Sequence, residues 1–308
     1  MERKIGVSTC AMQAFFGNKK AIEMAARTGA TSIDLDLGIR GINFLTEGAV
    51  YAQGDDAVVE YFTDLKNYAA SLGMEIYQTH AHNDGFKKDP AFNEKQIELF
   101  RLDLLATSAL GAKVCVFHGP SNANCASWRY PDGALLNRLY DEQYTAVLAH
   151  AKRYGVYAAA ETGGLYVDAP LPTCGYFAYF KNFEAGYRRM RATENGDAFA
   201  VCVDSGHSSM AMFFGNPQPA DIIRRLGPGA VQALHLHDNK MSFDEHCLPM
   251  TGAVNFPDLF RALDEVGYTG VYNLEVNFNI FGRDFIEETA TFSVQLLRRM
   301  LDRHDGKI

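Results

Sequence analysis

Several features that would assign the chain to a common protein class are missing from its sequence. The six cysteines include no CxxC pair, and Cys115 and Cys202 lie within apolar runs, where a free thiol packs as a small hydrophobe. We therefore interpret all the cysteines as reduced, as in a cytoplasmic protein. No apolar run reaches membrane-spanning length, and no long apolar segment follows the charged residues near the N-terminus. We expect neither a secretory signal nor a membrane partner.

Positive charge is also scarce. The chain has 29 Lys and Arg residues against 37 Asp and Glu residues, which gives a formal net charge of −8 at pH 7. Because nucleic acids and anionic membranes need a clustered positive field, this balance disfavours both as partners. The sequence also contains no P-loop and no Gly-rich turn of the kind that binds dinucleotides. A doubly wound open sheet is therefore the weaker structural alternative.

The sequence does contain an alternation of short apolar segments and amphipathic stretches. The amphipathic stretches have helical spacing, and several end at a glycine, as helices commonly do. The expected strands are residues 5–9, 32–37, 74–80, 113–118, 156–161, 199–204, 231–235 and 271–275. This number of strand–helix units fits one barrel, which is typically about 250 residues long and often longer. The sequence thus predicts an α/β protein with a (β/α)8 TIM-barrel fold, in a single domain over residues 1–308.

The later expected strands end in side chains that can bind a metal ion. From the third strand to the eighth, these residues are His80, His118, Glu161, Asp204, His235 and Glu275. A single His or Glu at the end of a strand is usually only a solvated loop residue. Here, however, several strands end in such a residue, and the carboxyl ends of barrel strands meet at one mouth. In the stretch VCVDSGH, we expect Gly206 to let the backbone turn where a side chain would obstruct it, so that Asp204 and His207 point at one site. The whole set around one mouth indicates a functional site.

Four of these residues, Glu161, Asp204, His235 and Glu275, form an oxygen-rich ligand set with one imidazole. Such a set suits Mn²⁺, Mg²⁺ or Co²⁺, and a catalytic Zn²⁺ also fits, whereas a structural zinc site favours thiolates. One bound divalent ion would polarise a substrate carbonyl and hydroxyl, which acidifies the adjacent C–H bond. Glu161 and Glu275 end different strands, so we expect them to approach this carbon from different sides as acid and base.

At these residues the sequence resembles the xylose isomerase-like TIM barrels, a superfamily that includes ketose 3-epimerases, inosose dehydratases and endonuclease IV. The matching motifs are AAETGG around Glu161, DxxH at residues 204–207, HLHD at residues 235–238 and LEV around Glu275. The resemblance implies that Glu161, Asp204, His235 and Glu275 bind one divalent cation. His237 lies two residues beyond His235 and can face the same way, so the choice between these two histidines stays open.

The resemblance further implies a metal-dependent isomerase or epimerase of sugars or sugar phosphates. Glu161 and Glu275 would exchange a proton at the carbon next to a keto group. A lyase, of the inosose dehydratase kind or eliminating from keto glycosides, begins with the same step and is an alternative. We expect the substrate to contact several residues near the mouth, namely His207, His80, His118, His237, Trp128 and Arg129. Trp128, the one tryptophan, can stack on a sugar face, although the packing of a long loop explains it equally well.

Endonuclease IV represents a different function within the same resemblance, because it binds three zinc ions. Its further zinc ligands correspond here to His80, His118, His207, Asp244 and His246. A multi-zinc phosphodiesterase is therefore another alternative, although the net charge of −8 favours a small sugar over duplex DNA. A barrel that only binds its ligand is a third alternative, which the intact ligand set disfavours. The sequence leaves the oligomeric state open, including a homo-oligomer.

Overall fold

Parallel strands form the centre of the structure. The computed structural model describes residues 3–38, 48–163, 165–168, 171–241 and 243–308. The strands of the central sheet are β1 (Ile5–Ser8), β2 (Ser32–Asp36), β3 (Glu75–His80), β4 (Val114–Phe117), β5 (Tyr157–Glu161), β8 (Phe199–Asp204), β9 (Val231–His235) and β10 (Tyr272–Leu274). Their spatial order is β10, β1, β2, β3, β4, β5, β8, β9. A parallel bridge between Leu236, just after β9, and Leu274 of β10 joins the two edges.

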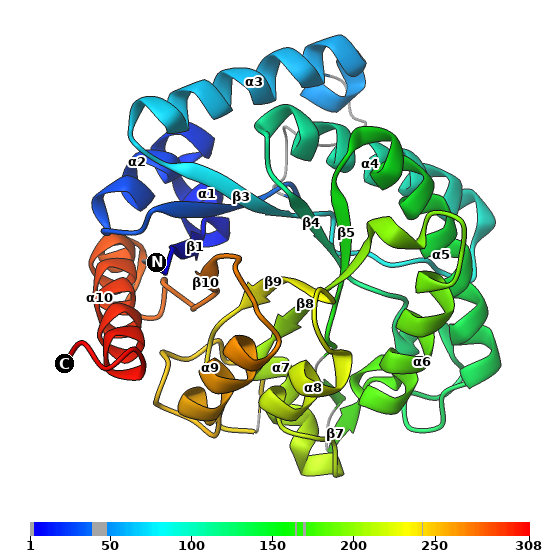
Figure 1. Ribbon diagram of the computed structural model, residues 1–308. Coiled ribbons are helices and arrows are strands. Elements are labelled where there is room, and N and C mark those ends of the chain that lie inside the picture. The colour runs from blue at the N-terminus through cyan, green and yellow to red at the C-terminus, as the bar shows by residue number, and fades with distance from the viewer. Residues whose placement is uncertain (1–2, 39–47, 164, 169–170, 242) are drawn as a thin grey trace.

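Helices surround this sheet, as Figure 1 shows. The main helices are α2 (Asn18–Arg27), α3 (Asp55–Ser71), α4 (Pro90–Leu110), α5 (Gly133–Tyr154), α6 (Phe180–Arg191), α8 (Pro219–Leu226), α9 (Phe256–Glu265) and α10 (Ile286–His304). Strands and helices alternate along the chain, and each strand predicted from the sequence overlaps a strand of the 8-stranded sheet. The predicted (β/α)8 TIM barrel is therefore confirmed.

Several short elements go beyond the predicted pattern. They are the helices α1 (Cys10–Phe16) and α7 (Ser205–Ala211), and the antiparallel hairpin of β6 (Leu165–Asp168) and β7 (Leu171–Cys174). Short 3₁₀ turns also occur, namely η1 (Val50–Gln53), η2 (Asn122–Asn124), η3 (Tyr176–Ala178), η4 (Gly196–Ala198), η5 (Met212–Phe214) and η6 (Arg283–Phe285). Such elements are shorter than the window over which hydrophobic periodicity becomes visible, so the sequence pattern does not reveal them.

Side chains alternate between the inside and the outside of the barrel along each strand. The inward residues form a small apolar cluster of their own, which includes Ala159 of β5 and Ala233 of β9. A larger cluster joins the outward strand residues to the surrounding helices. Because the inward positions recur at every second residue, Glu161 and His235 lie on the same inner surface, two residues beyond these alanines. The strands thus direct their last inward side chains into the mouth of the barrel.

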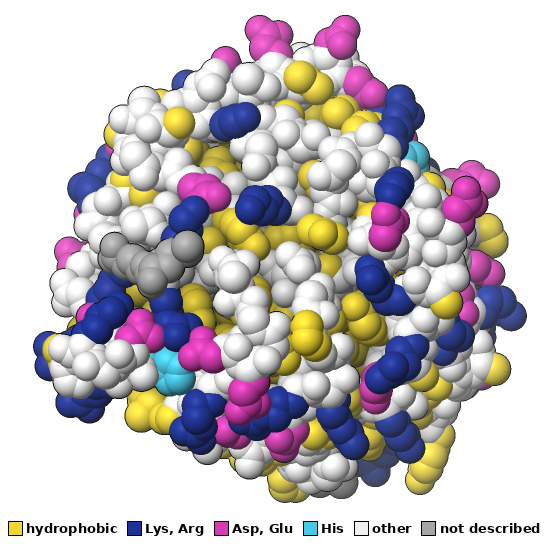
Figure 2. All heavy atoms as spheres, viewed as in Figure 1, with side chains coloured by type: hydrophobic (Ala, Val, Ile, Leu, Met, Phe, Trp, Pro, Cys, Tyr) yellow, Lys and Arg dark blue, Asp and Glu magenta, His cyan; other side chains and the backbone are white. Residues whose placement is uncertain are grey.

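Charged side chains of both signs are interspersed over the face of the molecule in Figure 2. Several of them pair between neighbouring helices, for example Arg27 of α2 with Glu287 of α10 and Arg224 of α8 with Asp258 of α9. None of the helices in the described part of the chain combines the length and the hydropathy that a membrane span requires.

Candidate functional site

The carboxylate of Glu161 lies at the centre of a group of histidines. One of its oxygens, Oε2, is 2.8 Å from Nε2 of His118 and 3.3 Å from Nε2 of His80. The other oxygen, Oε1, is 3.2 Å from Nδ1 of His235 and 3.2 Å from Nδ1 of His207. The Glu161 side chain is buried, so these imidazoles replace the water that would otherwise solvate its charge. The two oxygens thus face different pairs of histidines.

A second group forms where three carboxylates approach one imidazole. Nδ1 of His235 is 3.2 Å from Glu161, 3.3 Å from Glu275 and 3.9 Å from Asp204. One ligand atom from each of these four residues lies within 4.8 Å of the ligand atoms of the other three. Carboxylates gathered this closely repel one another unless a positive charge lies between them. The donor set and its spacing therefore fit a divalent cation.

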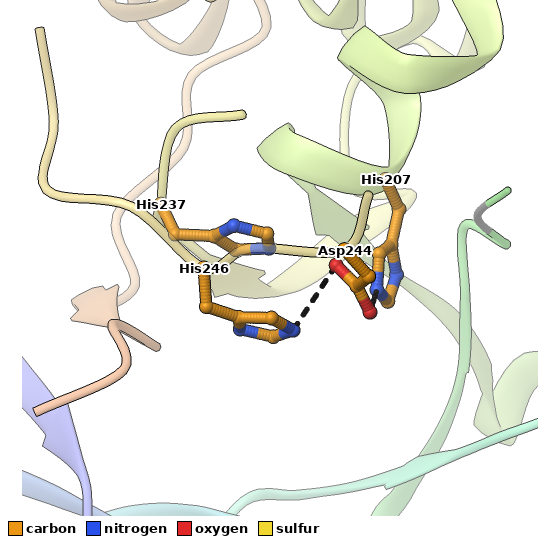
Figure 3. Close-up of side chains that lie close together, drawn as sticks. All are labelled: His207, His237, Asp244 and His246. Atoms are coloured by element: carbon orange, nitrogen blue, oxygen red, sulfur yellow. Dashed lines mark hydrogen bonds and ion pairs between the residues drawn. The ribbon is translucent and has the colours of Figure 1, made fainter. Parts of the chain in front are cut away.

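A third group lies beside α7 and the loop that follows β9, and it is shown in Figure 3. Asp244 connects it, because its carboxylate oxygens are 3.0 Å from Nε2 of His207 and 3.2 Å from Nε2 of His246. The ring of His237 stacks on the ring of His246, with centroids 3.9 Å apart. His246 has a φ of 47°, a left-handed conformation that is uncommon outside glycine and often found at functional sites. This group is another potential cation site.

The chain passes from β8 directly into α7, and the side chain of Asp204 caps this helix. Asp204 caps α7, because its carboxylate accepts a hydrogen bond of 2.6 Å from the backbone N–H of His207. Gly206 lies within α7 and does not have a positive φ, so it permits the turn by its lack of a side chain and not by a left-handed backbone. A Cβ atom at Gly206 would lie 2.0 Å from Cε1 of His237. The glycine therefore provides room for His237, whose Nε2 is 2.9 Å from the Asp204 carboxylate.

Burial and mutual attraction shift the pKa values of these groups in the metal-free protein. Burial disfavours the charged form of His80, but the hydrogen bond and charge of Glu161 outweigh it and raise the pKa of His80 to about 9. For Glu161, burial is likewise outweighed by His235 and His118, which hold its pKa well below the usual range. Glu275 behaves differently, because burial dominates and raises its pKa. The two glutamates therefore differ in proton affinity, with Glu161 the more acidic.

Similarity to known proteins extends over nearly the whole chain. A family model for the xylose isomerase-like TIM barrel matches residues 22–300. The chain belongs to this family. Among its relatives is y4fM, an uncharacterized protein of Sinorhizobium fredii, which is 23% identical over 268 residues that cover 79% of each chain.

Solved structures of xylose isomerase-like barrels also match the chain from end to end. A D-tagatose 3-epimerase-like protein is 18% identical, with a TM-score of 0.73 and coverage of 99% of both chains. The IolI protein, whose structure holds a zinc atom, is 16% identical, with a TM-score of 0.68 and coverage of 99% of this chain and 98% of IolI. At these identities the similarity establishes a shared fold.

Within this xylose isomerase-like barrel, the residues predicted from the strand ends do meet at one mouth. The structure also separates the two candidate histidines of the HLHD motif. His235 contacts Glu161 and Glu275, whereas His237 lies in the group of Asp244 and His246. His80 and His118 both contact Glu161.

Two pockets open beside Glu161 and its neighbours, and His118 and His207 line both of them. The first has an aromatic wall that includes Tyr140, Tyr144 and Phe177. The second is more polar, with lining residues Asn83, Asp84, Lys87, Asn124 and Asp244. Such a combination of an apolar wall and convergent polar groups is typical of small-molecule sites.

Trp128 and Arg129 belong to a loop beside the first pocket, since the backbone oxygen of Trp128 accepts a hydrogen bond from Asn122, which lines it. Both belong to the loop between η2 and α5, where Trp128 is half-buried and Arg129 is exposed. Neither is among the described residues that line the two pockets. Their predicted contact with substrate remains a prediction.

One residue of the site was missed in the sequence. Asp34 of β2 is buried, and its carboxylate is 3.1 Å from Nε2 of His235. The alternation of apolar and polar residues in this strand suggests a solvated face, but in a barrel the polar face of the strand points inward. A sequence signal for Asp34 did exist. The strands of a parallel barrel are buried on both faces, so an aspartate within such a strand indicates a buried carboxylate that needs partners.

Proposed function

We propose that the protein is a divalent-metal-dependent sugar isomerase or epimerase that moves a proton at the carbon next to a keto group. The observation that carries the proposal is the approach of Glu161 and Glu275 to the same imidazole atom, at 3.2 and 3.3 Å, from β5 and from the end of β10. Glu161, Asp204, His235 and Glu275 would hold one cation, which we take to be Mn²⁺, Mg²⁺, Co²⁺ or Zn²⁺. The zinc atom in the IolI structure supports such a site on this fold.

The two glutamates would act on opposite faces of one carbon. A cation held by these residues would polarise adjacent substrate oxygens and so acidify the C–H bond next to the carbonyl. One glutamate takes this proton, and the electron pair of the C–H bond moves toward the carbonyl oxygen. The other glutamic acid returns a proton to the opposite face, and the electron pair returns to carbon. The lowered pKa of Glu161 and the raised pKa of Glu275 suit the base and the acid of such a pair.

A keto sugar or cyclic polyol is the substrate class that these surroundings favour. His207 lines both pockets and would hydrogen-bond a substrate oxygen, with His80, His118 and His237 nearby. The aromatic wall of the first pocket could pack against the apolar face of a ring. The structural similarity to a D-tagatose 3-epimerase-like protein also supports a sugar. If a leaving group lies β to the carbonyl, the same first step gives elimination, and the enzyme is a lyase.

The decisive experiment replaces each glutamate by glutamine. We expect Glu161→Gln and Glu275→Gln to lower turnover by about 10²–10⁴-fold on a panel of ketoses, inososes and 3-keto glycosides, because an amide cannot transfer the proton. Loss of deuterium exchange at the substrate carbon in D₂O would locate the defect in proton transfer. Glu184→Gln is the matched control, because Glu184 pairs with Arg188 on the surface of α6. Wild-type turnover in both site variants would contradict the two-glutamate mechanism.

A second candidate function is a multi-zinc phosphodiesterase of the endonuclease IV kind. It is favoured by the position of Glu161, whose two oxygens face separate histidine pairs, because a carboxylate in this position can bridge two cations. Hydrolysis of a simple phosphodiester such as bis(p-nitrophenyl) phosphate by the zinc-loaded protein, without sugar turnover, would favour this candidate.

A further inference from the structure

A buried carboxylate lies inside the barrel, below the candidate metal site. Asp34 of β2 is 1% exposed, and a single oxygen, Oδ2, accepts all of its side-chain hydrogen bonds. The donors are Nε2 of Gln78 at 2.9 Å and Nδ2 of Asn273 at 3.1 Å, and Nε2 of His235 lies at 3.1 Å. Among the described residues, no hydrogen-bond partner is recorded for Oδ1. A buried anion is costly unless a positive charge or strong donors compensate it, so this arrangement needs an explanation.

The surrounding strands are adapted to this carboxylate. The register between β2 and β3 shifts after Ile33, so that Ile33 pairs with Ile76 but Asp34 pairs with Gln78. The shift adds one residue to β3 and puts Gln78 directly beside Asp34. On β1, a Cβ atom at Gly6 would lie 2.7 Å from Oδ1 of Asn273, so the glycine leaves room for the amide. Both donors are therefore held in place by the strands themselves.

These contacts determine which nitrogen of His235 carries a proton. The side-chain NH₂ groups of Gln78 and Asn273 only donate, and a carboxylate oxygen only accepts, so Oδ2 of Asp34 is an acceptor for His235 as well. The proton of the neutral imidazole then lies on Nε2, and the lone pair lies on Nδ1. Nδ1 is the atom that faces Glu161 and Glu275. A carboxylate on the far nitrogen of a metal-binding histidine also fixes the ring orientation and makes the ligand more basic.

The geometry points to Asp34 as a positioning residue that holds His235 in the tautomer able to bind a cation through Nδ1. This inference rests on the proposed metal site, since it assigns Asp34 the role of orienting His235, which is one of the ligands of that site. Asp34 itself contacts no cation in this role, because His235 lies between it and the other three ligands. Its negative charge also complements the added positive charge of a cation bound beyond the imidazole.

The test measures metal affinity in the full-length protein by competition of a chelator for Zn²⁺ and for Co²⁺. We expect Asp34→Asn, which keeps an acceptor oxygen but loses the charge, to weaken binding by about 10-fold, and Asp34→Ala to weaken it by up to about 100-fold. The Co²⁺ absorption spectrum should change in both variants, because the His235 ring is no longer fixed. A lower stability alone would leave affinity and spectrum of the folded fraction unchanged.

Asp103→Asn is the matched control. Asp103 is equally buried and also holds a histidine, His82, at 2.9 Å from Nδ1, but His82 is outside the candidate ligand groups. We expect this variant to lose stability without losing metal affinity. If Asp34→Asn does not fold, Gln78→Met removes one donor at similar volume and should weaken binding several-fold.

The outcomes separate the two proposals. Wild-type protein that binds no divalent cation would overturn the metal site and the role of Asp34 together. Wild-type binding with unchanged affinity and spectrum in the Asp34 variants would overturn the role of Asp34 alone. Equal losses of affinity in the Asp34 and Asp103 variants would also overturn it, because they would indicate a general effect of buried carboxylates.

Discussion

Charge balance in the barrel mouth depends on individual buried pairs, and His80 with Glu161 is the most accessible to experiment. In the metal-free protein this pair raises the pKa of His80 to about 9, against about 6.5 in the unfolded chain. The folded protein therefore keeps a proton over a pH range in which the unfolded chain loses it. The stabilisation is complete below about pH 6.5 and is lost as the pH rises through 9.

We therefore expect the free energy of unfolding of the chelator-treated protein to fall between pH 6.5 and 9. The contribution of His80 is on the order of 3 kcal/mol, from the difference between its folded and unfolded pKa values. Urea unfolding at pH 6, 7.5 and 9 measures it. His80→Gln should make the fall smaller by this contribution, because the glutamine cannot titrate, while other histidines with raised pKa values, such as His246, still titrate. A wild-type stability that rises over this range would contradict the assignment of a protonated His80.

Some residues of the candidate site could be predicted from the sequence, and the roles of others could not. The ligand candidates could be predicted, because a polar residue that ends an apolar strand is visible in one dimension. The choice between His235 and His237 could not, since both have the same parity and their different partners, Glu275 and His246, come from later parts of the chain. The group that leaves no room for a side chain at Gly206 could not be predicted either, because it is the ring of His237, which approaches from a different part of the chain.

At the scale of elements, Asp204 belongs to β8 and also begins α7. Its carboxylate accepts the backbone N–H of His207 at 2.6 Å, and it contributes to the candidate ligand set. These two roles can be separated by substitution. Asparagine is as good a helix cap as aspartate, but its neutral amide is a weaker ligand for a divalent cation.

We expect Asp204→Asn to weaken metal binding while the metal-free protein keeps the stability that the cap provides. Asp204→Ala should weaken binding as well and lose about 1 kcal/mol more of the free energy of unfolding in the presence of a chelator. Denaturant unfolding of both variants, with and without metal, checks the difference. If the two variants are equally stable without metal, the cap contributes nothing measurable, and α7 is held by packing alone.

The elements themselves were largely predictable, for a physical reason. Strands buried on both faces are apolar runs, and the helices between them carry one apolar face, so the alternation of a barrel is visible in the sequence. The hairpin of β6 and β7 was not predictable, because its strands lie outside this alternation of strands and helices. The inward aspartate of β2, Asp34, was missed for a different reason, since a polar residue in a strand normally indicates a solvated face.

For the whole molecule, the barrel brings together ligand groups that the sequence spreads from His80 to Glu275. The three neighbouring groups can be occupied to different extents, and this extent separates the two candidate functions. A sugar isomerase needs one cation, held by the group around His235. A phosphodiesterase of the endonuclease IV kind would fill the groups of His118 and of Asp244 as well.

Metal content and thermal stability should therefore be measured together. Under the proposed function we expect one equivalent of metal by elemental analysis, and one peak of anomalous density between Glu161 and Glu275. Removing a cation present at about 100 times its dissociation constant costs about 2.7 kcal/mol, which for a chain of this size lowers the melting temperature by about 5 °C. Unchanged melting in chelator, with no metal found, would contradict the metal site.

A double variant, His118→Gln with His246→Gln, makes the metal count decisive. Each substitution removes a ligand candidate from a group other than the one around His235. If the enzyme uses one cation, the double variant should keep one equivalent of metal and the full thermal shift on chelation. If it uses three, the metal content should fall from three equivalents toward one, and phosphodiester hydrolysis should disappear with the lost ions.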